Sequence, residues 1–188
     1  ERTSIVLHIT DDMVSAVVGI AETQQVLLDS FRSFGAGKAA MQERIRTDAG
    51  GVKLSTLGAV IPEQGVVGAK VYTTIAGQFS FAIMLFSSKD GRPLASLEAN
   101  AITRLRTAAC SVIAARYLAR PAAKRLALFG TGVQGRAHAL QMSGAYALDE
   151  ILVVPFDDPP DMPERIAAET GVATRFVSVE EAVGSADL

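Results

Sequence analysis

Three glycines about two thirds of the way along the chain, Gly130, Gly132 and Gly135, have the spacing G-x-G-x-x-G. In a dinucleotide-binding turn the first glycine allows a tight bend, the second lets a diphosphate approach the backbone, and the third lets the next helix pack closely on the strand. That helix would direct unpaired N–H groups and the positive end of its dipole at the diphosphate, so the cradle needs no charged side chain. The expected cradle residues are Gly130, Thr131, Gly132, Val133, Gln134 and Gly135.

The residues around the glycines have the pattern that such a turn requires. Residues 126–129 are a short apolar run typical of a buried strand, and Val133, Ala137, Leu140 and Gly144 recur on one face of a helix. The alternative is an ordinary turn between a strand and a helix, but the context favours a nucleotide site.

A second parallel strand is predicted at residues 150–154, and two aspartates follow it. Asp157 is the candidate for the acid that binds the ribose hydroxyls, although it follows Gly130 at a longer spacing than the usual 20 or so residues. Asp158 is an alternative, and a solvated loop acid is another. An acid at this place favours NAD over NADP because it repels a 2′-phosphate.

The elements that must position these groups form two predicted domains, residues 1–120 and 121–188. In the first, Asp11 is the expected N-cap of a helical segment, residues 48–51 should turn between two strands, and residues 54–61 and 78–87 read as further strands. Lys70 lies in another strand. A helix is predicted from Asn100 or Thr103 to Ala119.

The fold class is therefore α/β. A first domain of helices and a mainly antiparallel sheet should precede a doubly wound, Rossmann-type parallel sheet. Only three strands of that second sheet are expected before Leu188, counting a third at residues 172–177. We therefore expect the natural protein to be longer than this chain.

Composition excludes several classes of function. The net charge is −2, with 18 Lys and Arg against 20 Asp and Glu, which disfavours nucleic-acid binding. The single cysteine, Cys110, cannot form an internal disulfide, and no Cys/His cluster has metal-binding spacing. The longest apolar run is too short to span a bilayer, and the N-terminus has no leader pattern. These features fit a cytoplasmic protein without a metal.

Several segments together resemble the ornithine cyclodeaminase/mu-crystallin family, in family order and at about family spacing. They are residues 68–71 (GAKV), 91–95 (GRPLA), 103–109 (TRLRTAA), 115–121 (ARYLARP) and 130–134 (GTGVQ). The resemblance extends from about Asp11 to Leu188. The RTAA helix followed by GTGxQ is its most specific part.

The resemblance implies a substrate domain whose sheet forms a homodimer, followed by an NAD(P)-binding domain. It also implies that Arg44, Lys70 and Arg106 bind the carboxylate of a small amino or imino acid, with Lys70 beside the reacting carbon. Arginine and lysine suit that role chemically, because arginine binds a carboxylate with two parallel hydrogen bonds and lysine adds a compact charge. The alternatives are a solvated Arg44, a Lys70 that extends from a sheet edge, and an Arg106 paired with Glu98 or Asp90.

The implied activity is hydride transfer at Cα with an imine intermediate, as in the deaminating cyclisation of ornithine. Two alternatives remain open: an amino-acid dehydrogenase or ketimine reductase, and a mu-crystallin-like protein that binds nucleotide and ligand with little turnover. Residues 71–78 lack the proline and asparagine usual in the family, so the substrate is not defined. The aspartate that cyclodeaminases use as acid and base is expected beyond Leu188.

Overall fold

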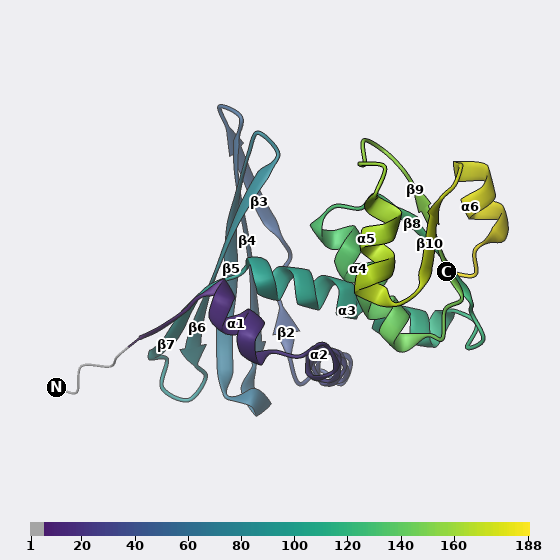
Figure 1. Ribbon diagram of the computed structural model, residues 1–188. Helices are drawn as coiled ribbons and strands as arrows, with labels where there is room; N and C mark the ends of the chain where they lie inside the picture. The colour runs from purple at the N-terminus through teal and green to yellow at the C-terminus, as the bar shows by residue number, and fades with distance from the viewer. Residues whose placement is uncertain (1–5) are drawn as a thin grey trace. The chain divides into compact units, whose positions relative to one another are not determined.

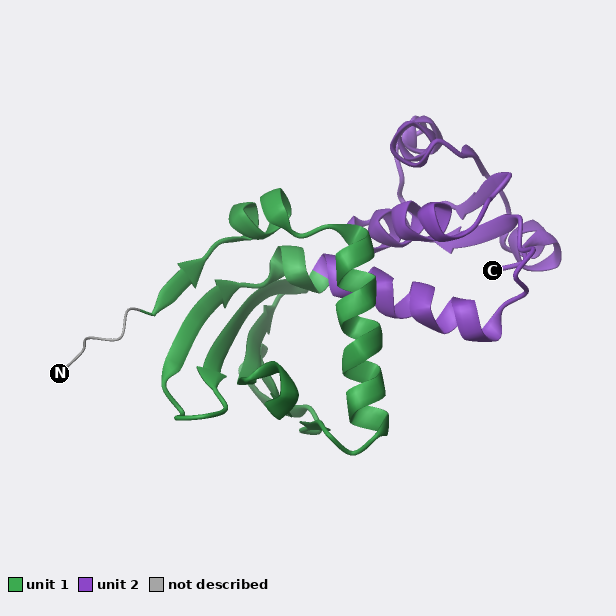
Figure 2. Cartoon of the chain, turned by 90° about the horizontal axis from the view of Figure 1, so that it is seen from below, with its two compact units in different colours: residues 1–103 green, residues 104–188 purple. Residues whose placement is uncertain are grey.

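The computed structural model describes residues 6–188, which divide into two compact units, residues 6–103 and 104–188 (Figure 2). The division falls inside helix α3 (Asn100–Leu118), upstream of the domain boundary predicted after residue 120. The reason is that the later turns of this helix belong to the second core, where Val112 is fully buried against Leu126 and Leu128. A boundary predicted from the position of a loop cannot show which core each turn of the preceding helix packs against.

The first unit is built on a seven-stranded sheet with the order β1-β7-β6-β5-β4-β2, and β3 also pairs with β4. All pairs are antiparallel except β1 with β7, so the expected mainly antiparallel sheet is confirmed. The strands are β1 (Leu7–Ile9), β2 (Ala40–Met41), β3 (Ile45–Ala49), β4 (Val52–Ile61), β5 (Val66–Ile75), β6 (Gln78–Ser87) and β7 (Pro93–Glu98).

The predicted turn at residues 48–51 is confirmed as the connection of the β3–β4 hairpin. Gly50 and Gly51 have φ of 58° and 77°, a left-handed conformation that glycine adopts without steric cost. The other tight connection, between β5 and β6, fixes their register so that Lys70 lies opposite Ile83 and Tyr72 lies opposite Phe81. Because side chains alternate along a strand, Lys70 and Tyr72 share one face of the sheet.

The helices of the first unit are α1 (Asp11–Val17), α2 (Ile20–Gly35) and the short 3-10 helix η1 (Pro62–Gln64). The prediction that Asp11 caps the first helix is wrong. Thr10 is the N-cap, and its hydroxyl accepts a hydrogen bond from Met13 N at 3.3 Å. The Asp11 carboxylate instead accepts hydrogen bonds from Ala101 N at 2.7 Å and Asn100 Nδ2 at 2.8 Å, so it caps the start of α3.

The second unit holds a three-stranded parallel sheet with the order β10-β9-β8, as expected for half of a doubly wound sheet. Helices α4 and α5 lie on one side of this sheet and α6 lies on the other (Figure 1). Alternate side chains of β9 are buried accordingly: Ile151 and Val153 belong to the core with α4 and α5, whereas Leu152 packs with Ala182 of α6. The elements are β8 (Arg125–Phe129), α4 (Val133–Ala145), β9 (Glu150–Val154), α5 (Met162–Thr170), β10 (Ala173–Phe176) and α6 (Val179–Ser185).

Across residues 6–188, no helix combines the length and the apolar character that a membrane crossing requires.

Candidate functional sites

The turn between β8 and α4 gives each of the three glycines a distinct structural role. Gly130 has φ of 87°, in the left-handed region. A Cβ atom built on Gly135 would lie 2.1 Å from the carbonyl oxygen of Gly130, so only glycine allows the helix to pack this closely. A Cβ atom on Gly132 would meet no atom within 4 Å, which leaves the backbone there open to an incoming group. The bend at Gly130 and the close packing at Gly135 are as the motif predicts, and Gly132 leaves room for the diphosphate that the motif implies.

The N-terminus of α4 is suited to an anion. Gly132 is its N-cap, and no side chain within the described chain forms a capping hydrogen bond there. The N–H groups of the first helical turn, from Val133 to Gly135, therefore point out of the helix end, where the helix dipole favours negative charge. A diphosphate is the group that such an end of a helix commonly binds.

The turn that follows β9 is tied to the glycine turn by one pair of side chains. The Thr131 hydroxyl, on a residue only 5% exposed, donates a hydrogen bond to Oδ1 of Asp158. Oδ2 of the same carboxylate accepts from the backbone N–H of Phe156 at 3.0 Å. The Thr131 hydrogen bond, and then that of the Phe156 N–H, hold the pKa of Asp158 below its usual value. Asp157 is exposed beside this pair.

On the sheet of the first unit, Lys70 is held by three neighbours. Its half-buried side chain donates from Nζ to Thr103 Oγ1 at 2.7 Å. The ammonium also lies 4.1 Å from the ring centroid of Phe81 and 5.5 Å from that of Tyr72. Such contacts stabilise a cation through the negative face of each ring. Lys70 therefore has a defined position on the sheet, unlike a lysine that extends from an edge into solvent.

Arg44 approaches the same ring. Its guanidinium carbon lies 6.0 Å from the ring centroid of Tyr72, which is 8% exposed. The structure thus brings two of the three predicted carboxylate ligands, Arg44 and Lys70, to one aromatic side chain. Tyr72 itself continues into a cluster of rings, with centroids 5.2 Å from Phe81 and 6.3 Å from Phe79.

A further cation, Arg46, was not predicted. Hydrogen bonds from Ser55, and then from Arg46, lower the pKa of the Tyr72 hydroxyl, and the charges of Arg44 and Arg46 act in the same direction. The positive groups of Lys70, Arg44 and Arg46 therefore all interact with Tyr72. The sequence signal for Arg46 was its position two residues after Arg44, which places both on one face of an extended segment.

Arg106, the third predicted ligand, lies partly buried on α3 in the second unit, and it forms no ion pair with the described residues of that unit. The two acids proposed as its alternative partners have contacts of their own. Asp90 pairs with Arg92 at 3.4 Å, and Glu98 Oε2 accepts from Asp11 N at 3.0 Å. The structure therefore places Arg44 and Lys70 together in the first unit. Arg106 belongs to the second unit, which also contains the glycine turn.

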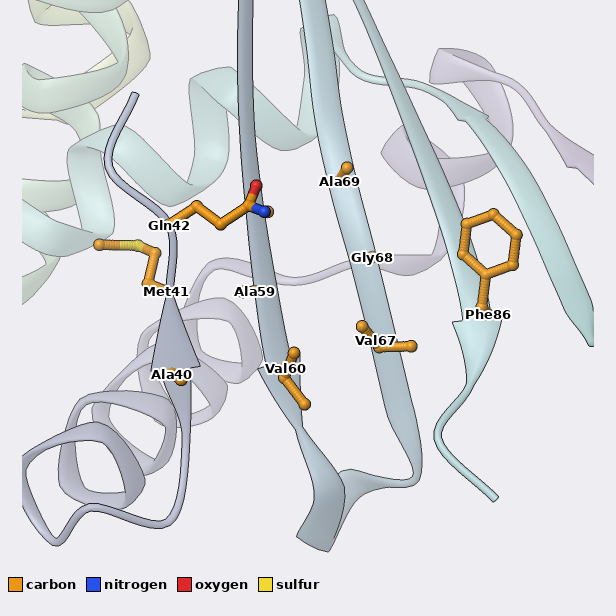
Figure 3. A pocket seen from close by; sticks show the side chains of 10 residues that line it. Ala40, Met41, Gln42, Ala59, Val60, Val67, Gly68, Ala69 and Phe86 are labelled. Carbon is orange, nitrogen blue, oxygen red and sulfur yellow. The ribbon is translucent and has the colours of Figure 1, made fainter. Parts of the chain in front are cut away.

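Two pockets lie on the sheet of the first unit. One, of about 360 Å³, is lined mainly by apolar side chains, among them Met41, Val60, Val67 and Phe86, with Gln42 at its upper end (Figure 3). The other, of about 230 Å³, includes Lys70. The first is an apolar hollow on the face of the sheet that carries Val67, whereas Lys70 and Tyr72 project from the opposite face.

The fold and the two sites define an α/β protein with a dinucleotide-type turn in one unit and a cationic, aromatic sheet face in the other. The family model described as the ornithine cyclodeaminase/mu-crystallin family matches residues 7–188. The chain belongs to this family.

Individual relatives agree with the family assignment. A Delta(1)-pyrroline-2-carboxylate reductase of Bacillus cereus is 34% identical over 103 residues, which are 55% of this chain and 29% of the relative. An ornithine cyclodeaminase of Agrobacterium fabrum is 37% identical over 106 residues, 53% of this chain and 28% of the relative. The alignments thus span less than a third of these curated relatives.

A solved structure of a probable ornithine cyclodeaminase from Bordetella pertussis is 54% identical, with a TM-score of 0.95, and covers 97% of this chain and 59% of that one. A Thermococcus litoralis Delta(1)-pyrroline-2-carboxylate reductase, solved with NADH and L-proline, has a TM-score of 0.89 at 22% identity over 97% of this chain and 60% of that chain. The latter similarity is one of fold.

Proposed function

We propose that the protein is an NAD(P)-dependent enzyme that transfers hydride at Cα of a small amino or imino acid through an imine, in the manner of the ornithine cyclodeaminases. The observation that carries this proposal is the turn at Gly130, Gly132 and Gly135. The first glycine has a left-handed backbone, the second has open space around it, and the third packs too closely on the turn for a side chain. A dinucleotide-binding turn requires these three features. When bound there, a nicotinamide cofactor supplies or accepts the hydride.

The substrate carboxylate is assigned to Arg44, Lys70 and Arg106. Support comes from Arg44 and Lys70, whose charged groups lie 6.0 Å and 5.5 Å from the centroid of the same Tyr72 ring, where a carboxylate would meet a planar guanidinium and a compact ammonium together. Holding the carboxylate fixes the adjacent Cα, which is the atom that exchanges hydride. Lys70 is the candidate catalytic residue because Thr103 and Phe81 hold its ammonium in one position, and an ammonium that binds the carboxylate would lie beside that carbon.

The reaction is either a deaminating cyclisation of ornithine or a related diamino acid, or the reduction of an imine by an amino-acid dehydrogenase or ketimine reductase. In the cyclising reaction the side-chain amine attacks the imine, ammonia leaves, and the hydride returns from a cofactor that stays bound. In the reductive reaction the cofactor is consumed. The curated relatives include enzymes of both kinds.

We further propose a cytoplasmic homodimer. A reducing compartment suits the single Cys110, which is unpaired. The sheet of the first unit exposes large apolar side chains on several strands, and such surfaces commonly mark protein interfaces. Examples are Leu54, Ile75 and Phe79, which are 44%, 50% and 56% exposed. Light scattering on the purified protein would give twice the chain mass if the proposal is correct.

A substrate panel tests the activity. Ornithine, lysine, alanine, proline and cyclic imino acids would each be incubated with NAD(H) and with NADP(H), while nicotinamide absorbance and ammonia release are followed. Ammonia without net change in absorbance indicates cyclodeamination, and a change in absorbance indicates a dehydrogenase or reductase. Tight nucleotide binding without turnover on any member would instead indicate a binding protein of the mu-crystallin kind.

A further inference from the structure

A single carboxylate joins the two turns at the carboxyl edge of the parallel sheet. β8 and β9 are adjacent parallel strands, so the turns that follow them lie at the same edge. Asp158 spans them: one oxygen accepts from the Thr131 hydroxyl in the glycine turn, and the other accepts from Phe156 N in its own turn. Because both oxygens are engaged, Asp158 is less suited than Asp157 to bind a ligand directly.

The two residues before Asp158 are turned outward. Phe156 is 96% exposed, which is unusual for a large aromatic side chain, and Asp157 is exposed next to it. A flat exposed ring offers a stacking surface to a purine base, and a carboxylate offers acceptors to a vicinal diol. Their backbone position depends on the Asp158 carboxylate, since it binds the N–H of Phe156.

The negative charges of the turn after β9 suit an adenosine ribose without a 2′-phosphate, as in NAD. Residues 155–161 contain three aspartates and no lysine or arginine. The arginines nearest in sequence are already paired: Arg165 with Asp161 at 2.8 Å, and Arg175 with Glu150 and Glu181, each at 2.7 Å. Arg136 of α4 is also paired, with Glu169 through two nitrogens. A 2′-phosphate would therefore meet negative charge without an arginine to bind it.

We infer that Asp158 is a positioning residue for the adenosine half of the cofactor: by linking the turn after β9 to Thr131, it presents Phe156 to the adenine and Asp157 to the ribose of NAD. This inference rests on the proposed cofactor. It assigns to Asp158 an indirect role, because its carboxylate acts through the neighbouring residues and does not touch the ligand. It also predicts that NAD is preferred over NADP.

The test compares Asp158→Asn and Thr131→Val with the unmodified full chain. Dissociation constants would be measured by calorimetry for NADH, NADPH, ADP-ribose and nicotinamide mononucleotide, with thermal unfolding as a separate readout. Asp158→Asn and Thr131→Val should each weaken NADH and ADP-ribose by about tenfold, the effect of losing one charge-assisted hydrogen bond. Nicotinamide mononucleotide should bind unchanged.

Asp161→Asn is the matched control, because it removes the same charge from the same loop but its partner is Arg165. It should leave every affinity unchanged. The inference is overturned if Asp158→Asn binds ADP-ribose as the unmodified chain does, or if it weakens nicotinamide mononucleotide equally, which would indicate general loss of structure. Failure of the unmodified chain to bind any of the four nucleotides would overturn the proposed function as well, so the two failures are distinguishable.

Discussion

The ammonium of Lys70 lies 4.1 Å from the ring centroid of Phe81, on the strand that pairs with its own. The register of β5 and β6 creates this contact, since Lys70 is directly opposite Ile83 and Phe81 is the next residue along the same face. The glycine two residues before Lys70 contributes to this register. A Cβ on Gly68 would lie 2.6 Å from the carbonyl oxygen of Met84, so the close approach of the two strands requires glycine there.

Replacement of Lys70 by methionine should abolish turnover while nucleotide affinity stays within about twofold of the original. Methionine keeps most of the apolar stem that packs on Phe81 but removes the ammonium proposed to bind the carboxylate. Steady-state rates and NADH titration would be measured side by side. Lys53→Met is the control, because Lys53 is an exposed strand lysine paired with Asp48 at 3.5 Å. Full activity in Lys70→Met would contradict its assigned role.

Removal of the Tyr72 hydroxyl in Tyr72→Phe should raise KM severalfold and change kcat little. The ring remains for Lys70 and Arg44, but the hydroxyl no longer anchors it through Ser55, which is 2% exposed, and Arg46. Substrate affinity then falls because the ring that positions two cations is less constrained. A large fall in kcat with unchanged KM would show instead that the hydroxyl takes part in the chemistry.

The effect of Tyr72→Phe on the free energy of unfolding should depend on pH. The pKa of Tyr72 in the folded protein is lowered from its usual value of 10.0, so ionisation of this phenol favours the folded state. That contribution is absent at neutral pH and grows as the pH rises through the lowered pKa toward 10.0. The difference in unfolding free energy between the unmodified protein and Tyr72→Phe should therefore increase from neutral to alkaline pH. Chemical denaturation at several pH values measures it, and a constant difference would contradict the cause assigned to the shift.

Gly135→Ala should destabilise the protein by about 1 to 3 kcal/mol, the usual cost of forcing extra volume into a packed site. Its methyl group would meet the Gly130 carbonyl, which is backbone and cannot rotate away. Gly144→Ala in the same helix is the matched control, because a Cβ there meets nothing within 4 Å. The control should be neutral or slightly stabilising, since alanine favours a helix. Equal unfolding midpoints for the two variants would argue against close helix packing at Gly135.

Much of the fold followed from patterns of residues. The glycine turn, β9 and the β3–β4 hairpin were predicted from apolar runs and turn residues. Each of these elements is determined by residues that are close together in the sequence. The cap at Asp11 was not predicted correctly, because its carboxylate meets Ala101, a residue distant in the chain. Only the parallel pairing of β1 with β7 brings these residues together.

The candidate site residues likewise include some that the sequence identified and some that it did not. Arg44 and Lys70 were identified by resemblance, and the structure adds the ring of Tyr72 that joins them. The roles of Arg46 and Asp158 were missed because each depends on a partner in another strand or turn. Asp158 in particular looked like a second choice for the ribose, whereas its contact with Thr131 depends on two adjacent parallel strands.

In the proposed division of roles, the glycine turn binds the cofactor and the sheet face of the first unit binds the substrate. Gly132→Ala tests it most directly, since a methyl group fits there without touching the protein but occupies the space that a diphosphate would approach. NADH titration should show at least a tenfold loss of affinity with an unchanged unfolding midpoint. NADH affinity equal to that of the unmodified protein would contradict this division of roles.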